Sequence, residues 1–194
     1  GVPRLLDAFR AGHSGYIVMS RVTGSPLGGR NRTDPWPVGQ AIACVRAVAA
    51  VVRRLHAHNW IHGDIHPQNV LVDDNATTLL DFADAVHLDG QGRWRGEVHW
   101  GRWEFVPPEQ FEGFTVLDRS VDTYALCGLL AYLILGHGPF RVPGPFPGTA
   151  GWRAKRAEFL AARASPQLAG INEPLLSMIR RGLAVEPRER FESA

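Results

Sequence analysis

The chain has 194 residues, of which 45% are hydrophobic and 21% are charged, and its formal net charge is only +2. This length suffices for one domain with a sizeable core, and the nearly balanced charge gives no reason to expect a nucleic-acid or membrane-surface partner. The most hydrophobic run, from Ala125 to Leu135, is shorter than the roughly 20 apolar residues that span a bilayer, so it predicts a buried core helix.

The two cysteines, Cys44 and Cys127, each lie within an apolar helical pattern. Their number and spacing fit neither a metal site nor the disulfide framework of a secreted protein. A charged leader followed by an apolar segment is not visible either. We therefore expect two buried, reduced thiols and a cytoplasmic protein.

Two strand-like runs come first, at residues 2–9 and 15–20, with turn residues around Gly12 between them. This pattern predicts a β-hairpin. Residues 22–37 are then rich in Gly, Pro, Ser, Asn and Thr, which indicates a loop.

A helix is predicted after this loop, through residues 41–59. Asp34 and Pro35 favour the N-cap and the first position of a helix, so we expect it to begin there. Apolar residues recur at steps of three and four, which places them on one face. They are Ile42, Val45, Ala49, Val52 and Leu55.

Two more short apolar runs, at residues 69–74 and 77–82, meet at turn-forming residues and predict a second hairpin. Residues 88–105 show no periodicity, and we expect a long functional loop or partial disorder there. Ser120 is placed to cap the apolar helix that follows it. Two further helices are expected at residues 154–164 and 174–183.

The most informative segments are HGDIHPQN at residues 62–69 and DFA at residues 81–83. Together they resemble the catalytic and metal-binding loops of the protein kinase superfamily. The resemblance implies that Asp64 accepts the proton of a substrate hydroxyl, that Asn69 and Asp81 bind Mg²⁺, and that ATP is the phosphoryl donor.

The spacing of these residues makes chemical sense apart from the resemblance. A strand, turn and strand between Asn69 and Asp81 would carry both side chains to one end of a hairpin, beside Asp64. Amide and carboxylate oxygens are the ligands that Mg²⁺ prefers. Taken singly, each side chain could instead cap a helix or form a turn.

A different reading of the same segment is a metal cluster of histidines. The four candidates are His56, His58, His62 and His66. Nothing in their spacing supplies the supporting hydrogen-bond partners that metal-binding histidines use.

Three distant markers fit the kinase resemblance in the right order. Glu109 in Pro-Pro-Glu resembles the glutamate that closes the activation segment, and Arg190 matches the arginine that pairs with it. Asp122 stands where an aspartate of the central helix braces the catalytic loop. The resemblance therefore implies a structural supporting role for His62, Glu109, Asp122 and Arg190.

The sequence GYIVMSRV at residues 15–22 resembles the strand and hinge that hold adenine. By this resemblance, Met19 is the gatekeeper, and the backbone of Ser20 and Val22 hydrogen-bonds the base. Leu71 would form the apolar floor under it, although an ordinary core leucine fits that position equally well.

Several kinase elements are not found in these residues. They are the glycine-rich loop, the strand lysine and the helix glutamate; the sole lysine, Lys155, lies far downstream. We expect the missing part of the small lobe in a longer parent chain. The alternatives are a truncated regulatory or scaffold protein and a pseudokinase.

Gly63 and His66 bear on regulation and on the substrate. Gly63 stands where regulated kinases have an arginine, and residues 81–109 contain no Ser, Thr or Tyr, so we expect activity without phosphorylation of this loop. His66 replaces the usual lysine and could lie near the transferred phosphate. Both residues also resemble aminoglycoside phosphotransferases, which leaves a small-molecule acceptor as the alternative to a protein hydroxyl.

A binding-module hypothesis comes from tryptophans and arginines that could stack on bases and meet phosphates. They are Trp94, Trp100, Trp103, Arg93, Arg95 and Arg102. We favour the kinase reading over nucleic-acid binding because they fall within the activation segment.

The prediction is therefore an α+β, protein kinase-like fold with a mostly helical large lobe and a short hairpin remnant of the small lobe. Residues 1–22 would end the small lobe, and residues 23–194 would form the large lobe without its last helix. We expect an ATP- and Mg²⁺-dependent Ser/Thr protein kinase-like phosphotransferase that does not enter a membrane and that, as this piece alone, transfers poorly.

Overall fold

The computed structural model describes residues 1–28, 34–74, 76–97, 102, 104–112, 114–140, 158, 161 and 166–194. Its described helices are α1 (Val38–Ala57), α2 (Ser120–Leu135) and α4 (Leu175–Gly182), with short 3₁₀-helices η1 (Pro67–Asn69), η2 (Pro108–Glu112) and η3 (Pro187–Glu189). Its strands are β1 (Leu5–Ala11), β2 (Ser14–Met19), β3 (Ser25–Pro26), β4 (Trp60–Ile61), β5 (Val70–Val72), β6 (Thr77–Leu79), β7 (Val86–His87), β8 (Trp94–Glu97) and β9 (Phe114–Leu117). None of the helices in these ranges has the length and hydrophobicity to cross a bilayer.

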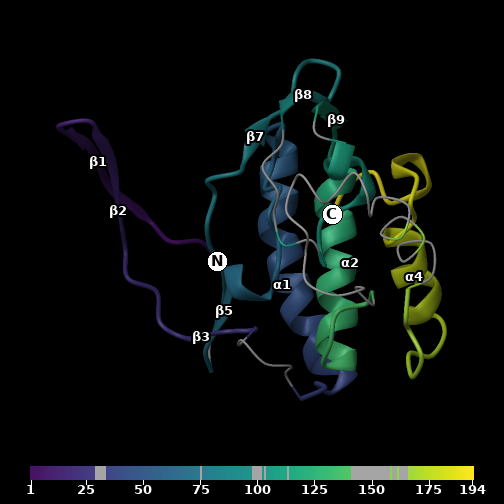
Figure 1. Ribbon diagram of the computed structural model, residues 1–194. Coiled ribbons are helices and arrows are strands. Elements are labelled where there is room, and N and C mark those ends of the chain that lie inside the picture. Colours follow the sequence, from purple (N-terminus) through teal and green to yellow (C-terminus); the bar gives the residue numbers. More distant parts are fainter. Residues whose placement is uncertain are drawn as a thin grey trace.

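The central element is α2, which lies between α1 and α4 and packs against both (Figure 1). Of its 16 residues, only Leu135 is not buried. A helix that is apolar on every side has to be surrounded by protein, so the expectation of a buried core helix at residues 125–135 is confirmed.

The ends of α2 differ in how they are capped. The sequence predicts a cap from the Ser120 hydroxyl, which is wrong: Arg119 is the N-cap, and Asp118 Oδ1 accepts the Ser120 N–H at 2.8 Å. At the other end Gly136 adopts a φ of 71°, and its N–H donates to the carbonyl of Tyr132. A left-handed residue at this place is how many helices stop.

The buried face of α1 is one narrow stripe. It consists of Ala41, Cys44, Val45, Val48, Val52 and His56. The steps of three and four residues are as predicted, but the stripe is centred slightly away from Ile42, Ala49 and Leu55, which are only half-buried.

The expected start of this helix at Asp34 and Pro35 is wrong, because α1 begins at Val38 without a side-chain cap. The N–H of Trp36 donates to the Leu133 carbonyl at 2.8 Å. That bond ties the preceding segment to α2. Pro37 has a ψ of 133°, which is extended rather than helical, and the residue before a proline, here Trp36, disfavours the helical conformation.

Both cysteines are free and buried, as predicted. Burial raises the pKa of the Cys127 thiol to about 12, and it also raises the pKa of Cys44. Thiols in this environment are not ionised at neutral pH and are poor nucleophiles.

Both predicted hairpins are present. β1 and β2 pair antiparallel, with the rings of Phe9 and Tyr16 stacked at 5.2 Å, and this hairpin extends away from the helices (Figure 1). β5 and β6 form the second hairpin, and β3 adds to it at the edge of β5.

The expectation of an irregular loop at residues 88–105 is wrong in part, because β8 pairs antiparallel with β9. Trp94 of β8 packs against a buried cluster that includes Ile61 and Leu117. β8 has only four residues, and Trp94 is its one large apolar side chain, so it shows no alternation that a sequence pattern could reveal. Trp100, Trp103, Lys155 and most of the helix expected at 154–164 lie outside the described residues.

Replacing Gly182 by alanine tests the close packing of α2 and α4. A Cβ atom at Gly182 would overlap the buried Cys127 side chain. We expect Gly182→Ala to lower the free energy of unfolding by about 1–3 kcal/mol, the usual cost of overpacking a core. Urea unfolding followed by circular dichroism measures this.

Gly39→Ala is the matched control, because a Cβ atom at Gly39 meets nothing within 4 Å. Alanine is the better helix former, so this variant should gain about 0.5–1 kcal/mol. A Gly182→Ala protein as stable as the parent would contradict the packing argument.

Candidate functional site

The candidate catalytic loop follows β4 and leads through η1 into β5. Ile61, the last residue of β4, is fully buried, and β4 pairs with β7. The loop then exposes part of Asp64 before Ile65 returns to the core with 1% exposure. Buried residues on both sides therefore hold the loop in place.

Asp64, His66 and Asn69 come together in this loop. Asn69 Nδ2 donates to both the carboxylate and the carbonyl of Asp64, each at 3.0 Å. His66 Nε2 lies 3.4 Å from the same carboxylate. Since His66 Nδ1 accepts the Gln68 N–H at 3.1 Å, the ring proton is on Nε2 and faces Asp64.

Burial by itself would raise the pKa of the Asp64 carboxyl, because the charged form loses water. The hydrogen bond from His66, together with His62 and Asn69, outweighs burial and holds the pKa below its ordinary value of 3.8. The side chain is therefore a carboxylate at neutral pH, which is the form that can accept a proton.

Asp81 lies beyond the end of β6, at the same end of the second hairpin as Asn69. The Leu80 N–H donates to the Asn69 carbonyl at 2.8 Å, which fixes the two segments beside each other. Asp81 is exposed and has a φ of 57°, and its Oδ1 accepts the Ala83 N–H at 3.2 Å. Aspartate tolerates this left-handed conformation better than most residues.

These residues suit a magnesium ion. The Asn69 Nδ2 group is engaged by Asp64, so its amide oxygen is the atom left for a metal, and Asp81 adds carboxylate oxygens. Hard oxygen ligands of this kind are what Mg²⁺ binds.

The buried carboxylate of Asp122 in α2 holds the candidate catalytic loop through hydrogen bonds. Asp122 has 0% exposure; its Oδ2 accepts the His62 N–H at 2.9 Å, and its Oδ1 accepts the Gly63 N–H at 3.0 Å. Gly63 adopts a φ of 81°, and a Cβ there would lie 3.0 Å from the Asp84 carbonyl oxygen. A larger residue would be strained at this point of the loop.

The ring of His62 connects the two motifs. Its Nδ1 accepts the Asp64 N–H at 3.3 Å, and its Nε2 lies 3.0 Å from the Leu80 carbonyl, to which it donates. The ring also meets Phe82 edge-on, with centroids 4.9 Å apart. His62 thus links Asp64, the expected base, to Leu80, the residue just before Asp81.

Glu109 and Arg190 form a bidentate ion pair in which Arg190 is fully buried and Glu109 is partly buried. The two nitrogen–oxygen distances are 2.6 and 2.7 Å, and Arg190 also donates to the carbonyls of Ala184 and Val185. Its guanidinium stacks over the Tyr124 ring of α2 at 4.8 Å. The pair joins η2, the segment after α4, and the core helix.

The residues expected to hold adenine are divided between two parts of the structure. Met19 ends β2 and is 52% exposed, whereas Leu71 lies in β5 and is half-buried. The Ser20 N–H donates to the Arg4 carbonyl at 2.8 Å, so its carbonyl is the group left for a ligand. The roles of these residues and of Val22 stay predictions.

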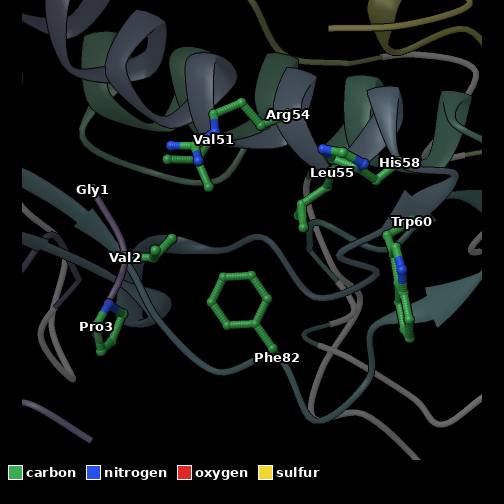
Figure 2. A pocket seen from close by; sticks show the side chains of 9 residues that line it. All are labelled: Gly1, Val2, Pro3, Val51, Arg54, Leu55, His58, Trp60 and Phe82. Carbon is green, nitrogen blue, oxygen red and sulfur yellow. The ribbon is translucent and has the colours of Figure 1, made fainter. Parts of the chain in front are cut away.

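A cavity of about 390 Å³ lies beside the metal motif rather than over Asp64. Figure 2 shows the Phe82 ring across this cavity from Val51, Arg54 and Leu55 of α1, with Val2 and Trp60 at its sides. Phe82 therefore belongs to the Asp-Phe-Ala motif and also lines this mostly apolar cavity.

The alternative histidine cluster is not formed. Across the described ranges, no group of three or more His, Cys, Asp or Glu side chains is placed to hold a metal ion. His56 instead lies 2.9 Å from Asp122, a contact that the sequence reasoning missed. Its place four residues after buried Val52, on the buried stripe of α1, is the signal that could have found it.

Comparison with known proteins identifies the family of the chain. A family model described as the protein kinase domain matches residues 1–194. The chain is 26% identical to serine/threonine-protein kinase PknH of Mycobacterium tuberculosis over 92% of its length, and 27% identical to PknD of that organism over the same share. It is 31% identical to serine/threonine-protein kinase pkn2 of Myxococcus xanthus over its whole length.

The chain spans only part of these relatives. It covers 28% of PknH, 27% of PknD and 24% of pkn2. The similarity therefore concerns one segment of each longer protein.

Glu109→Gln tests the ion pair between Glu109 and the buried Arg190. The substitution keeps the size of the side chain but leaves the Arg190 charge buried without its partner, which should lower the free energy of unfolding by about 3–5 kcal/mol. Chemical unfolding measures the change. Glu186→Gln, at an exposed residue, should change it by less than about 0.5 kcal/mol, and equal stabilities of the two variants would refute the pairing.

His66→Leu tests what keeps Asp64 ionised. Removing the imidazole removes a hydrogen bond that lowers the pKa of Asp64, while burial still raises it. The pKa of Asp64 should therefore rise. Because its folded pKa is depressed, Asp64 stabilises the fold above its ordinary pKa, and this contribution disappears as the pH falls through the folded value. The loss begins near the ordinary pKa in both proteins, so in the variant it should be smaller and should be complete at a higher pH. A carbon-13 NMR titration of the magnesium-free protein measures the pKa; an unchanged or lower value would contradict the assignment.

Proposed function

Because this chain belongs to the protein kinase domain family, we propose that its protein transfers the γ-phosphoryl group of ATP to a hydroxyl group, as a Ser/Thr-type protein kinase. The observation that carries the proposal is the contact of Asn69 with Asp64, with the hairpin β5–β6 returning the chain to Asp81 beside them. A proton acceptor and two oxygen ligands thus occupy one end of one hairpin.

Asp64 is the proton acceptor in this proposal. Its carboxylate is ionised at neutral pH because its pKa is depressed. The substrate oxygen forms a bond to the γ-phosphorus, the bond from that phosphorus to the bridging oxygen of ADP breaks, and the hydroxyl proton passes to Asp64. Little more covalent work is required of the protein in phosphoryl transfer.

Asn69 and Asp81 would hold Mg²⁺ through their oxygens. When bound, this ion neutralises charge on the phosphates of ATP. The Asn69 amide also orients Asp64, since its Nδ2 donates to that carboxylate at 3.0 Å. His66, at 3.4 Å from the carboxylate, is placed to donate a hydrogen bond near the transferred group.

A protein hydroxyl is the acceptor that we favour. The relatives carry the name serine/threonine-protein kinase, and the Glu109–Arg190 pair joins the segment after the metal motif to the core. A small-molecule hydroxyl is the second candidate, because Gly63 and His66 resemble the small-molecule kinases.

For nucleotide binding, we infer a site between the end of β2 and β5. Residues 1–22 would belong to the small lobe and residues 23–194 to the large lobe. The β1–β2 hairpin stands apart from the helices (Figure 1), which supports such a division. The glycine-rich loop and the lysine of the family would have to come from the full-length protein.

Asp64→Asn in the full-length protein tests the proposal. Asparagine keeps the shape of the side chain but accepts a proton poorly, so kcat should fall by about 10²- to 10⁴-fold. Phosphate transfer from labelled ATP is measured with a panel of Ser/Thr peptides and of small hydroxyl compounds, and the better acceptor class identifies the substrate.

Asp74→Asn is the matched control. Asp74 is exposed at the turn of the same hairpin, far from the loop ends, so its variant should keep the activity of the parent. Transfer that survives Asp64→Asn would exclude Asp64 as the base, and a full-length parent without transfer to any acceptor would favour the pseudokinase alternative.

A further inference from the structure

The buried cluster on which Trp94 packs brings together distant segments of the chain. Its members, each at most 3% exposed, are Ile61, Leu88, Leu117 and Val121. Ile61 directly precedes His62 of the candidate catalytic loop, and Val121 directly precedes Asp122, which holds that loop. The Trp94 side chain thus packs on a cluster that contains both the residue before the loop and the residue before its support.

Residues 86–97, which follow the Asp-Phe-Ala motif, are attached to the rest of the structure at both ends. β7 pairs with β4, and the Leu88 N–H donates to the Asn59 carbonyl at 2.6 Å. Asp89 closes the turn that follows, because its Oδ1 accepts the N–H groups of residues 91 and 93. β8 then pairs with β9, with Trp94 opposite Leu117. The segment therefore joins the strand before the candidate catalytic loop to the strand before α2, and β7, β8 and β9 lie at the same end of the molecule (Figure 1).

Gly96 leaves room for the Trp94 ring along β8. Side chains two residues apart in a strand lie on the same face of the sheet, so position 96 is beside Trp94. A Cβ atom at Gly96 would lie only 2.6 and 2.7 Å from Cζ2 and Cη2 of the ring. Any larger residue at this position would therefore push the ring out of its place.

Regulated kinases order the segment after the metal motif with a phosphate that an arginine contacts. This chain has neither partner, since residues 81–109 contain no Ser, Thr or Tyr and residue 63 is glycine. The structure supplies contacts of another kind for the same segment. They are the backbone pairing of β8 with β9 and the apolar packing of Trp94, and neither of them requires a modification.

We propose that Trp94 is a positioning residue for phosphoryl transfer: by packing on the cluster of Ile61 and Val121, it holds residues 86–97 beside the candidate catalytic loop, in place of a phosphate. This inference rests on the proposed function. Trp94 does not touch the reacting atoms, so its effect passes through the cluster to the loop and to Asp122. The segment is then ordered as soon as the protein folds.

The test compares Trp94→Ala, Trp94→Phe and Gly96→Ala in the full-length protein. The first variant removes the ring, the second keeps much of the apolar packing, and the third keeps Trp94 but displaces its ring. We expect Trp94→Ala to lower kcat by about 10- to 100-fold, since a shift of 1 Å in catalytic geometry costs about 100-fold. Gly96→Ala should lower kcat in the same direction, and Trp94→Phe should retain most of it.

Val116→Ala is the matched control. Val116 is 42% exposed and stands next to buried Leu117 in β9, so its side chain lies on the other face of the same two strands. This variant should keep the kcat of the parent. Thermal unfolding shows whether each variant is folded at the assay temperature. Full kcat in folded Trp94→Ala, or Trp94→Phe as slow as Trp94→Ala, would refute the positioning role.

Amide hydrogen exchange followed by NMR distinguishes this inference from the proposed function, because it requires no activity. In the parent after phosphatase treatment, the amides that pair β8 with β9 should be protected. Trp94→Ala should speed their exchange, and that of the His62 and Gly63 amides, at least about 10-fold more than exchange within α2, because local opening affects only the segments it frees. General destabilisation would speed all of these amides by the same factor.

If Trp94→Ala does not fold, the parent and Gly96→Ala still decide through the same exchange measurement. Unprotected β8 amides in the phosphatase-treated parent would overturn the inference, even in an inactive protein. So would exchange in β8 and at His62 that stays unchanged in folded Gly96→Ala.

Discussion

The candidate catalytic loop depends on one buried carboxylate. Asp122 has no exposed surface and belongs to a helix that is buried on every side, so its position is set by the core itself. Its oxygens accept the N–H groups of His62 and Gly63 and face the ring of His56. A buried charge is tolerated only when hydrogen bonds replace the water it has lost. The same bonds that satisfy Asp122 therefore give the loop its shape.

A second buried charge ties the other side of the molecule to the same helix. Arg190 pairs with Glu109 through both oxygens and stacks over Tyr124 of α2. The close approach at Gly182 joins α4 to α2. The candidate catalytic loop is therefore anchored to the packed core, whereas two other candidate site residues, Met19 and Asp81, are exposed. Exposed edges are where a nucleotide and its metal could be reached from solvent.

Sequence reasoning was accurate where the signal is local. The hairpins and the helices over residues 38–57, 120–135 and 175–182 follow from periodicity and turn residues within short windows. It was wrong where a distant partner decides. The Trp36 N–H donates to the Leu133 carbonyl of α2, in the segment where the start of α1 was expected, and β8 pairs with β9. His56 was considered only as a metal ligand because its partner, Asp122, lies 66 residues away.

The sequence by itself determined the chemistry available to this protein. The order and spacing of Asp64, Asn69 and Asp81 place the proposed base and the two proposed metal ligands around one hairpin, because strand and turn propensities act over neighbouring residues. Only the tertiary structure decided how they are held. The contact of His56 with Asp122 and the hydrogen bonds from the His62 and Gly63 amides to Asp122 each join groups about sixty residues apart in the chain. Burial in a common core brings these groups within hydrogen-bond distance, and no local pattern encodes that.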